Sequence, residues 1–394
     1  MQKKDSLKAY INSNTLRCCL FICFVVMVLK LIVIDVASGD YTQFLSVWIK
    51  HLRENGGFEA ISTVEADYNA IYLYFLALFT YLPINDLYLI KFLSFIFDFV
   101  LAIGAFKIVS HFYKDNQNKN YYSFLAFACI LLMPTAFSNS ALWGQCDSIY
   151  TAFVIFTLYF MLEEKYNLAF IMYGFALTFK LQAIFILPCI GIIFLKNRNF
   201  SVLKFLWIPI VNIICYIPAV MCGKPISSVF DAYFCQVGEY SYKTVFGYPN
   251  IYYFFSIDNI DLIKPGIILT LLLLIFLMIF VLFTKGKLSK KEMLHLSILV
   301  IFLVTFFLPK MHDRYGYAGE MLSVIYFIII KRDCHIFALI NINTILNYLS
   351  YTCVVPEEYM PFVAISQGMV VVYFAYTFIK GRIDKHNSLK SVKS

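Results

Sequence analysis

Residues 265–284 read PGIILTLLLLIFLMIFVLFT, twenty residues without a charged side chain. A helix of about 20 apolar residues is long enough to cross the hydrocarbon core of a bilayer. The rest of the chain shares this character, since 61% of its 394 residues are hydrophobic and only 14% are charged. Soluble domains have about 45–50% apolar and about 25% charged residues. The composition therefore predicts an all-α polytopic membrane protein.

The sequence contains a dozen apolar segments. They occupy residues 17–37, 69–83, 87–111, 121–138, 147–162, 167–196, 203–222, 265–284, 293–309, 316–330, 335–353 and 360–379. The segment 69–83 is short and ends at Pro83, whereas 167–196 is long and interrupted at Lys180 and Gln182. We expect 69–83 to stay on the outer surface and 167–196 to form two short spans, which gives about 12 transmembrane helices.

The Lys and Arg residues predict the orientation of these spans. In this arrangement, 21 of the 32 basic residues fall on the side of the two termini and eight on the opposite side. If 69–83 crossed the membrane, only 10 basic residues would lie on the cytoplasmic side and 19 would lie on the outer side. Because cytoplasmic loops carry the excess of Lys and Arg, both termini are predicted to be cytoplasmic. The net charge of +8 is therefore attributed to topology and not to nucleic-acid binding.

This topology makes residues 1–394 a single integral membrane domain. Its larger exposed parts are a first external loop at 38–86, a long external loop at 223–264 and a basic cytoplasmic tail at 380–394. The other cytoplasmic loops are short and contain no P-loop, so chemistry is expected on the outer face. Most cysteines lie within apolar runs and lack the spacing of metal ligands.

The first external loop begins with a predicted amphipathic helix that lies in the membrane interface. Its apolar residues recur at helical spacing, and Asn55-Gly56-Gly57 ends the pattern. Asp40 precedes the first turn, and Asp67-Tyr68 precedes a second, shorter helix. Each of these carboxylates fits a helix cap as well as a functional group.

Two further clusters are predicted on the outer face. Trp143-Gly144-Gln145-Cys146-Asp147-Ser148 ends a span and is more polar than a turn requires, although a cap and an interfacial tryptophan would also explain it. Lys310-Met311-His312-Asp313-Arg314-Tyr315 gathers basic groups against the charge bias of the outer side. This pattern favours a phosphate ligand. The alternative is that Arg314 pairs with Asp313 or snorkels.

Two charged residues, Lys180 and Asp98, lie within apolar runs. Such residues are functional candidates in membrane proteins. We expect Lys180 to meet an anionic group near the outer turn and Asp98 to make a structural hydrogen bond.

These clusters, in this order, resemble the GT-C superfamily of polytopic glycosyltransferases, in particular bacterial proteins related to the second GPI mannosyltransferase. Gly39-Asp40-Tyr41 followed by Trp48 is similar to the start of the family's first external loop. Asp67-Tyr68 is similar to its Asp-Tyr-Pro-Pro segment, with Asn-Ala in place of Pro-Pro. The sequence 143–148 resembles its Trp-Gly-Gln-x-Asp-Ser pattern, 180–182 its Lys-x-Gln and 311–315 its Met-His-Glu-Arg-Tyr. The segment Tyr240–Tyr252 resembles a donor- or acceptor-facing segment more loosely.

The resemblance implies inverting transfer of one hexose, such as mannose or glucose, from a polyprenyl-phosphate donor to a hydroxyl of a glycan or lipid acceptor. Asp40 would be the catalytic base, and Arg314, His312 and Lys180 would bind the donor phosphate. The remaining candidates would position the substrate or the loops: Asp67, Tyr68, Trp143, Gln145, Asp147 and Asp313. No metal or other cofactor is expected, because protein cations can meet the charge of a monophosphate.

Two rival interpretations stay open at this point. A transporter or flippase for a lipid-linked sugar would also be polytopic and would also carry basic groups for a lipid phosphate. A polysaccharide polymerase would use a diphosphate-linked oligosaccharide donor instead. In each case the expected location is the cell membrane, with the active site on the extracellular side and the bilayer itself as a partner.

Overall fold

The computed structural model describes residues 2–230, 233, 242–255 and 257–391. Residues 231–232, 234–241 and 256 of the predicted long external loop lie outside the described residues, as do the first two residues of the Tyr240–Tyr252 segment and the last three of the tail. The chain divides into two units, Met1–Ala183 with Leu203–Glu239, and Ile184–Val202 with Tyr240–Ser394.

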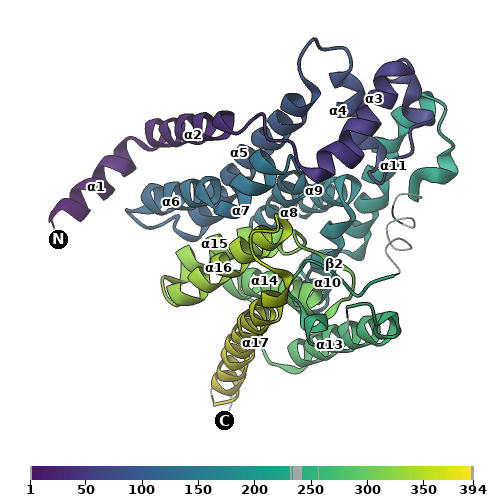
Figure 1. Cartoon of the computed structure of the whole chain (residues 1–394). Helices are drawn as coiled ribbons and strands as arrows, with labels where there is room; N and C mark the ends of the chain where they lie inside the picture. The colour runs from purple at the N-terminus through teal and green to yellow at the C-terminus, as the bar shows by residue number, and fades with distance from the viewer. Residues whose placement is uncertain (1, 231–232, 234–241, 256, 392–394) are drawn as a thin grey trace. The chain divides into compact units, whose positions relative to one another are not determined.

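The first unit is built around four helices that pack in succession. Helix α6 packs against α5, α5 against α8, and α8 against α9, with α11 on the other side of α9 (Figure 1). The α-helices of this unit are α1 (Gln2–Ser13), α2 (Thr15–Ile32), α3 (Ser46–Glu54), α4 (Ala70–Phe79), α5 (Asp86–Phe112), α6 (Lys119–Leu132), α7 (Pro134–Phe137), α8 (Asp147–Leu162), α9 (Tyr166–Phe179) and α11 (Trp207–Met221).

The second unit has α14 at its centre. Helix α14 contacts α10, α13, α15 and α17, and α16 packs against α15 and α17. Two strands of two residues each, β1 (Val245–Phe246) and β2 (Met311–His312), pair in parallel. The α-helices of this unit are α10 (Leu187–Asn197), α13 (Ile263–Phe283), α14 (Lys290–Phe307), α15 (Tyr317–Ile330), α16 (Cys334–Tyr351) and α17 (Met360–Ser391).

Two of the predicted apolar segments are broken in the structure. The segment 167–196 is interrupted where the sequence predicts, because α9 ends at Phe179 and Lys180 takes an extended conformation before the 3₁₀ turn Leu181–Ile186. The sequence predicts a single run at 121–138, but the structure bends there by 48° at Pro134. A residue before proline is driven out of the helical region, and Met133 is extended.

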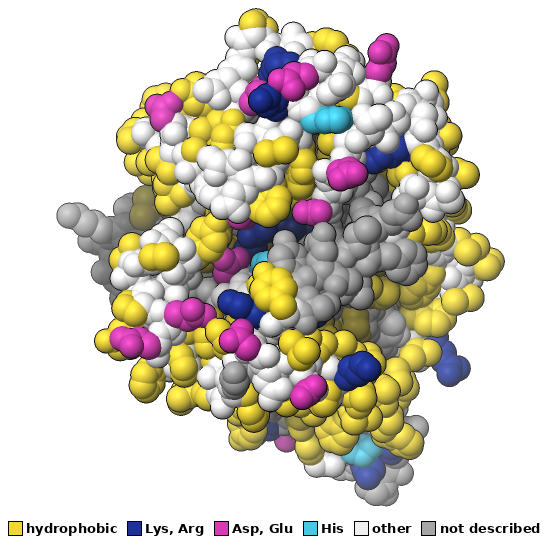
Figure 2. All heavy atoms as spheres, turned by 45° about the vertical axis from the view of Figure 1, so that its right-hand side comes forward, with side chains coloured by type: hydrophobic (Ala, Val, Ile, Leu, Met, Phe, Trp, Pro, Cys, Tyr) yellow, Lys and Arg dark blue, Asp and Glu magenta, His cyan; other side chains and the backbone are white. Residues whose placement is uncertain are grey.

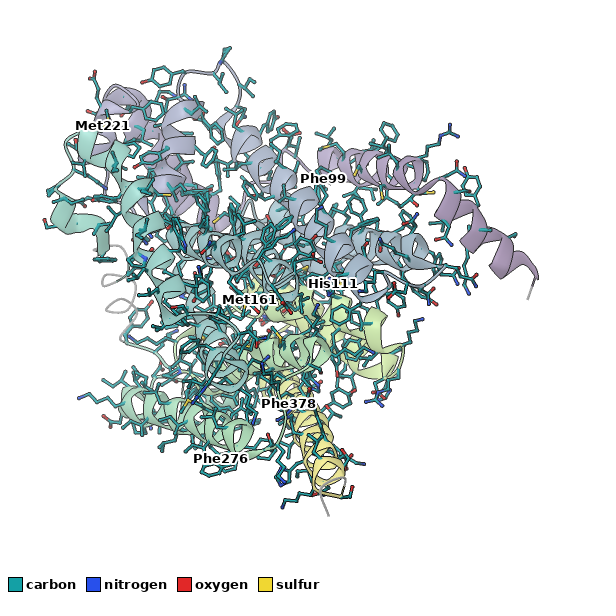
Figure 3. The ribbon with its side chains drawn as sticks, turned by 180° about the vertical axis from the view of Figure 1, so that it is seen from behind. Phe99, His111, Met161, Met221, Phe276 and Phe378 are labelled. Atoms are coloured by element: carbon teal, nitrogen blue, oxygen red, sulfur yellow. The ribbon has the colours of Figure 1, made fainter. Side chains whose placement is uncertain are left out.

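The surface and the helix lengths define a multi-pass membrane protein. Hydrophobic side chains cover much of the face seen in Figure 2, and Met221 and Phe276, labelled in Figure 3, are 82% and 64% exposed. Among the described residues, five helical segments are long and apolar enough to cross a membrane: Thr15–Ile32, Asp86–Phe112, Val202–Met221, Ile260–Phe283 and Glu357–Ser391. The bent pair Lys119–Leu132 and Pro134–Leu142 would be a sixth if it counts as one span.

The remaining apolar helices are shorter than a typical span. Helix α4 has 10 residues and is about 15 Å long, half the thickness of the hydrocarbon core. It is therefore too short to cross the membrane alone. The total of 12 spans and the external position of the first-loop helices stay predictions.

A buried ion pair links α2 to α5. Lys30 and Asp98 are both fully buried and form a salt bridge, and the Lys30 ammonium group also donates to Ser140 Oγ at 2.9 Å. The same ammonium group lies 4.8 Å from the centre of the Phe95 ring. Asp98 thus makes the structural contact expected of it, with a lysine from an earlier helix as its partner.

A buried arginine ties α17 to the loop that follows α13. Arg382 is fully buried and donates to Thr284 Oγ1 at 2.7 Å and to Glu292 Oε1 at 2.9 Å. Lys385 Nζ donates to the other carboxylate oxygen of Glu292 at 2.7 Å. Burial alone would raise the pKa of Glu292, but hydrogen bonds from Lys385, Ser289 and Arg382 outweigh it and lower the pKa from 4.5 to about 2.

The substitution Glu292→Gln tests this contact. Because the carboxyl group has a lower pKa in the folded chain than in the unfolded chain, it stabilises the fold above pH 4.5, and this contribution is lost as the pH falls toward 2. We expect the substitution to lower the free energy of unfolding at pH 7 by about 1–3 kcal/mol. Thermal unfolding in detergent between pH 7 and pH 3 should show a smaller acid-dependent loss in the variant than in the wild type.

The exposed Glu358 provides a matched control. Glu358→Gln should leave both the melting temperature at pH 7 and its pH dependence unchanged. Equal melting temperatures of Glu292→Gln and the wild type at pH 7 would contradict the role given to Glu292.

Candidate functional site

Asp40 lies in the first unit, directly before the π-helical turn Tyr41–Leu45 that continues into α3. Its side chain makes no capping hydrogen bond, so the capping alternative for this residue is wrong. Instead, Asp40 Oδ2 accepts a hydrogen bond from Gln145 Nε2 at 2.6 Å. The Asp40 side chain is only half-buried, which leaves the carboxylate accessible to a substrate.

The helix that carries Asp40 forms where the periodicity predicts. Leu45, Trp48 and Ile49 are buried on one face, whereas Lys50 lies exposed on the other. Helix α3 ends at Glu54, and the following Gly56 and Gly57 have positive φ angles. The buried face fixes the helix to the rest of the unit and so fixes the position of Asp40.

Gln145 is the centre of the first cluster. Its side chain is almost fully buried, donates to Asp40 and accepts from the Tyr68 hydroxyl at 3.2 Å. The preceding Gly144 has φ +69°, a conformation that L side chains rarely adopt. The Gln145 carbonyl accepts from Ser94 Oγ at 2.7 Å. The turn therefore holds Gln145 rigidly between two candidate residues that are distant in sequence.

Asp147 and Lys180 form a buried ion pair beside this centre. Asp147 is fully buried, and its Oδ1 accepts from Lys180 Nζ at 2.5 Å. Its Oδ2 accepts from Asn139 Nδ2 at 2.8 Å. Lys180 Nζ also lies 5.7 Å from the centre of the Tyr68 ring, which suits a cation–π contact. Lys180 is thus anchored within the chain by Asp147.

Trp143 and Asp67 occupy the edges of the same unit. Trp143 is 5% exposed and is therefore a buried residue, not the interfacial tryptophan of the alternative interpretation. Its carbonyl accepts from Ser38 Oγ at 2.6 Å. Asp67 is half-buried at a bend before α4, and the N-cap of that helix is Asn69. Asp67 is therefore not the cap of α4.

The candidate residues of the second unit lie in the turn between α14 and α15. This turn is held by its pairing with β1, in which Phe246 is opposite His312 and their rings stack with centroids 5.0 Å apart. The Asp313 N–H donates to the Phe246 carbonyl at 3.1 Å. Gly247 has φ +98°, and a Cβ at that position would lie 3.0 Å from Asp313 Cβ. Glycine therefore permits this close approach.

Asp313 and Arg314 contact each other as one of the sequence interpretations expects. Arg314 Nη1 lies 3.6 Å from Asp313 Oδ1, and the Arg314 N–H donates to the same oxygen at 2.9 Å. Asn347 Nδ2 donates to the Asp313 carbonyl at 2.6 Å. Arg314 is only partly buried, with 15% of its side chain exposed. Burial also lowers the pKa of the neighbouring Lys310.

The structure adds polar residues that the sequence interpretation did not single out. In the first unit these are Asn139 and Ser94, which hold Asp147 and Gln145. In the second unit, Gln367 Nε2 donates to the Tyr248 hydroxyl at 3.0 Å, and Asn343 Nδ2 donates to Gln367 Oε1 at 3.1 Å. A detectable signal existed, since Asn343 and Gln367 are uncharged polar residues within long apolar runs.

Metal ligands do not converge in the part of the chain that the structure describes. No group of three or more His, Cys, Asp or Glu side chains is close enough there to hold a metal ion. Metal independence stays a prediction from the sequence.

The apolar helices and the buried ion pairs together indicate a multi-pass membrane protein that carries charged residues in its candidate site. Residues 140–257 match the family described as Mannosyltransferase (PIG-M). This match confirms the resemblance to GT-C glycosyltransferases and supports a membrane glycosyltransferase. It includes Trp143, Gln145, Asp147 and Lys180. A comparison with curated proteins finds no match.

The Asp147–Lys180 pair can be tested by a double-mutant cycle. Asp147→Leu and Lys180→Met each leave one charge buried without its partner, so each should lower the free energy of unfolding by about 3–5 kcal/mol. The double variant should be less destabilised than the sum of the two, because no buried charge is left. Melting temperatures of the four proteins in detergent measure the coupling. Additive losses would contradict the buried ion pair.

Proposed function

We propose that this protein is an inverting glycosyltransferase that moves one hexose from a polyprenyl-phosphate donor to an acceptor hydroxyl on the outer face of the membrane. The observation that carries the proposal is the cluster of Asp40, Tyr68 and Gln145 beside the Asp147–Lys180 pair. Three of these residues fall inside the match to the mannosyltransferase family. That family makes mannose our first choice of sugar.

Asp40 is the base in this proposal. Inverting transfer needs one carboxylate that takes the proton of the acceptor hydroxyl. The oxygen of that hydroxyl then attacks the anomeric carbon of the sugar. The bond from that carbon to the phosphate oxygen breaks, and the phosphate retains the electron pair. The hydrogen bond from Gln145 fixes the orientation of the Asp40 carboxylate, and partial exposure admits the hydroxyl. Tyr68 and Asp67, near the start of α4, help to position the acceptor.

The leaving phosphate needs positive charge to stabilise it. Arg314 and His312 supply donors for it from the turn between α14 and α15, where the contact with Asp313 and the stacking on Phe246 fix their positions. Lys180 is the third cation that we assign to the donor phosphate, and its ion pair with Asp147 fixes where its ammonium group lies. We expect no metal requirement, because Arg314, His312 and Lys180 offer hydrogen-bond donors to a monophosphate.

The charge distribution supports the orientation of the reaction. With about 12 spans and both termini in the cytoplasm, the candidate residues lie on the extracellular side, where a flipped lipid-linked sugar is presented. The first-loop helices at 38–86 then lie at the outer interface, next to the lipid carrier. The whole chain serves as one membrane domain in this topology.

The substitution Asp40→Asn tests the base. It keeps the shape and one hydrogen-bond acceptor for Gln145 but removes the proton acceptor, so kcat should fall by about 10²–10⁴-fold. The assay uses proteoliposomes supplied with purified polyprenyl-phosphate mannose or glucose and follows transfer of the labelled sugar to extracted membrane acceptors. Binding of the donor should change by less than twofold.

The exposed Glu54, at the end of α3 in the same loop, is the matched control, and Glu54→Gln should retain wild-type transfer. Full transfer by Asp40→Asn would rule out Asp40 as the base. Movement of the donor across the bilayer without transfer to any acceptor would instead indicate a transporter, and transfer only from a diphosphate-linked oligosaccharide would indicate a polymerase.

The substitution Arg314→Lys tests the donor side. Lysine keeps the charge but loses the planar pair of N–H groups that suits a phosphate, so we expect the KM for the donor to rise by about tenfold, which corresponds to about 1.4 kcal/mol. Steady-state kinetics at varied donor concentration measure this effect. The control Lys264→Arg changes an exposed cation that is also predicted on the outer side. An unchanged donor KM in Arg314→Lys would remove this residue from the proposal.

A further inference from the structure

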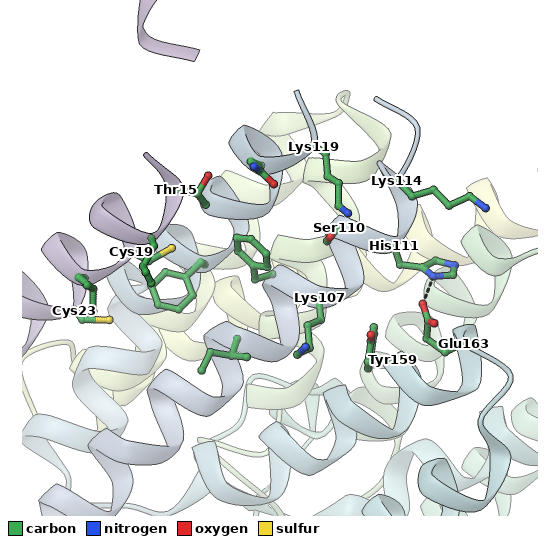
Figure 4. Close-up of a pocket in the computed structure, with 16 residues that line it drawn as sticks. Thr15, Cys19, Cys23, Lys107, Ser110, His111, Lys114, Lys119, Tyr159 and Glu163 are labelled. Carbon is green, nitrogen blue, oxygen red and sulfur yellow. Dashed lines mark hydrogen bonds and ion pairs between the residues drawn. The ribbon is translucent and has the colours of Figure 1, made fainter. Parts of the chain in front are cut away.

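The first unit contains a pocket of about 740 Å³ between α2, α5, α6 and α8 (Figure 4). It lies far from the Asp40 cluster. Ser94 contacts the Gln145 carbonyl near the N-terminal end of α5, whereas Ser110 lines the pocket near the C-terminal end of that helix. The two serines are 16 positions apart, which corresponds to about 24 Å along the helix. The pocket is therefore separate from the candidate active site.

The lining of the pocket has a basic part and an apolar part. The basic part consists of Lys107 from the last turns of α5, Lys114 from the turn that follows α5, and Lys119 from the start of α6. Figure 4 shows the Lys119 side chain extending toward Ser110, with Lys107 one turn below and Lys114 directed outward. The apolar part consists of Leu16, Leu20, Ile103, Phe106 and Phe127.

The basic part carries an excess of positive charge. Its one lining acid, Glu163, is held by His111, whose Nδ1 lies 2.5 Å from Glu163 Oε1. Within the residues that the structure describes, Lys107, Lys114 and Lys119 form no ion pair. Lys107 Nζ lies 5.8 Å from the centre of the Tyr159 ring. Lys107 and Lys119 thus line the hollow without an ion pair to any carboxylate that the structure describes, and Lys114 is directed away from it.

We propose that this pocket binds an anionic phospholipid, with its phosphate between Lys107 and Lys119 and one acyl chain along the apolar wall. An amphipathic ligand explains why a cationic end and a hydrocarbon-like wall occur in one cavity. The charge count places Lys114 and Lys119 on the cytoplasmic side, where anionic lipids attract basic residues next to membrane helices. A free phosphate would use the lysines but leave the apolar wall without a ligand.

The test measures binding of a fluorescent phosphatidylglycerol to the full-length protein in phosphatidylcholine nanodiscs. Removing the charges in Lys107→Gln/Lys119→Gln should weaken binding by about 25-fold, roughly fivefold for each lysine. The control Lys165→Gln removes an exposed lysine on the same predicted side that does not line the pocket, and it should change binding by less than twofold. Unlabelled phosphatidylglycerol should compete, whereas millimolar inorganic phosphate should not.

Several outcomes would overturn the proposal. If Lys165→Gln weakened lipid binding as much as the double variant does, binding would depend on the net charge of the protein and not on this pocket. Competition by inorganic phosphate as strong as by the lipid would mean that the pocket binds anions without using its apolar wall. Unchanged binding in the double variant would remove the two lysines as ligands. Melting temperatures of all three proteins, expected to be equal because the substituted lysines are at least partly exposed, separate these outcomes from misfolding.

Discussion

In a membrane protein, a charge buried away from water must be met by polar groups or a counter-charge of the chain itself, because neither the lipid nor the packed interior offers water or ions. Three buried contacts of this protein follow that constraint: Lys30 with Asp98, Lys180 with Asp147, and Arg382 with Glu292. Each joins segments that are far apart in sequence. The pairs therefore hold the helices in fixed relations to one another, which apolar packing alone would specify less precisely.

The same constraint shapes the candidate site. Asp147 is fixed by Lys180 on one oxygen and by Asn139 on the other, so the short turn that starts α8 has little freedom. Gln145, two residues earlier, can then present its amide to Asp40 in a constant direction. Both sides of this contact are next to π-helical turns, Tyr41–Leu45 and Ser138–Leu142. Such turns occur frequently at functional sites, where they redirect side chains.

Local features of the structure could be predicted from the sequence, but contacts between residues that are far apart in the sequence could not. The periodicity around Trp48 predicts the amphipathic helix, and the polar residues near Lys180 predict the break after α9. The partner of Asp40 is Gln145, 105 positions away, and spacing along a chain carries no information about such a contact. Hydropathy alone does not predict the bend at Pro134, because proline counts within an apolar run although its ring restricts the preceding residue. The turn around Arg314 was found from its composition, but its anchoring by β1 depends on a strand of two residues.

The pair between Lys30 and Asp98 has a consequence for biosynthesis. Helix α2 leaves the ribosome before α5, and at that moment Lys30 has no partner, since Asp98 has yet to be made. A lysine near the centre of an inserting helix costs about 2.5–3.5 kcal/mol, although a position near the end of α2 allows it to reach the interface. The ion pair that neutralises Lys30 can therefore form only once α5 has been made. A chain truncated between these helices would keep an unneutralised ammonium group in α2, a feature that membrane quality control could detect.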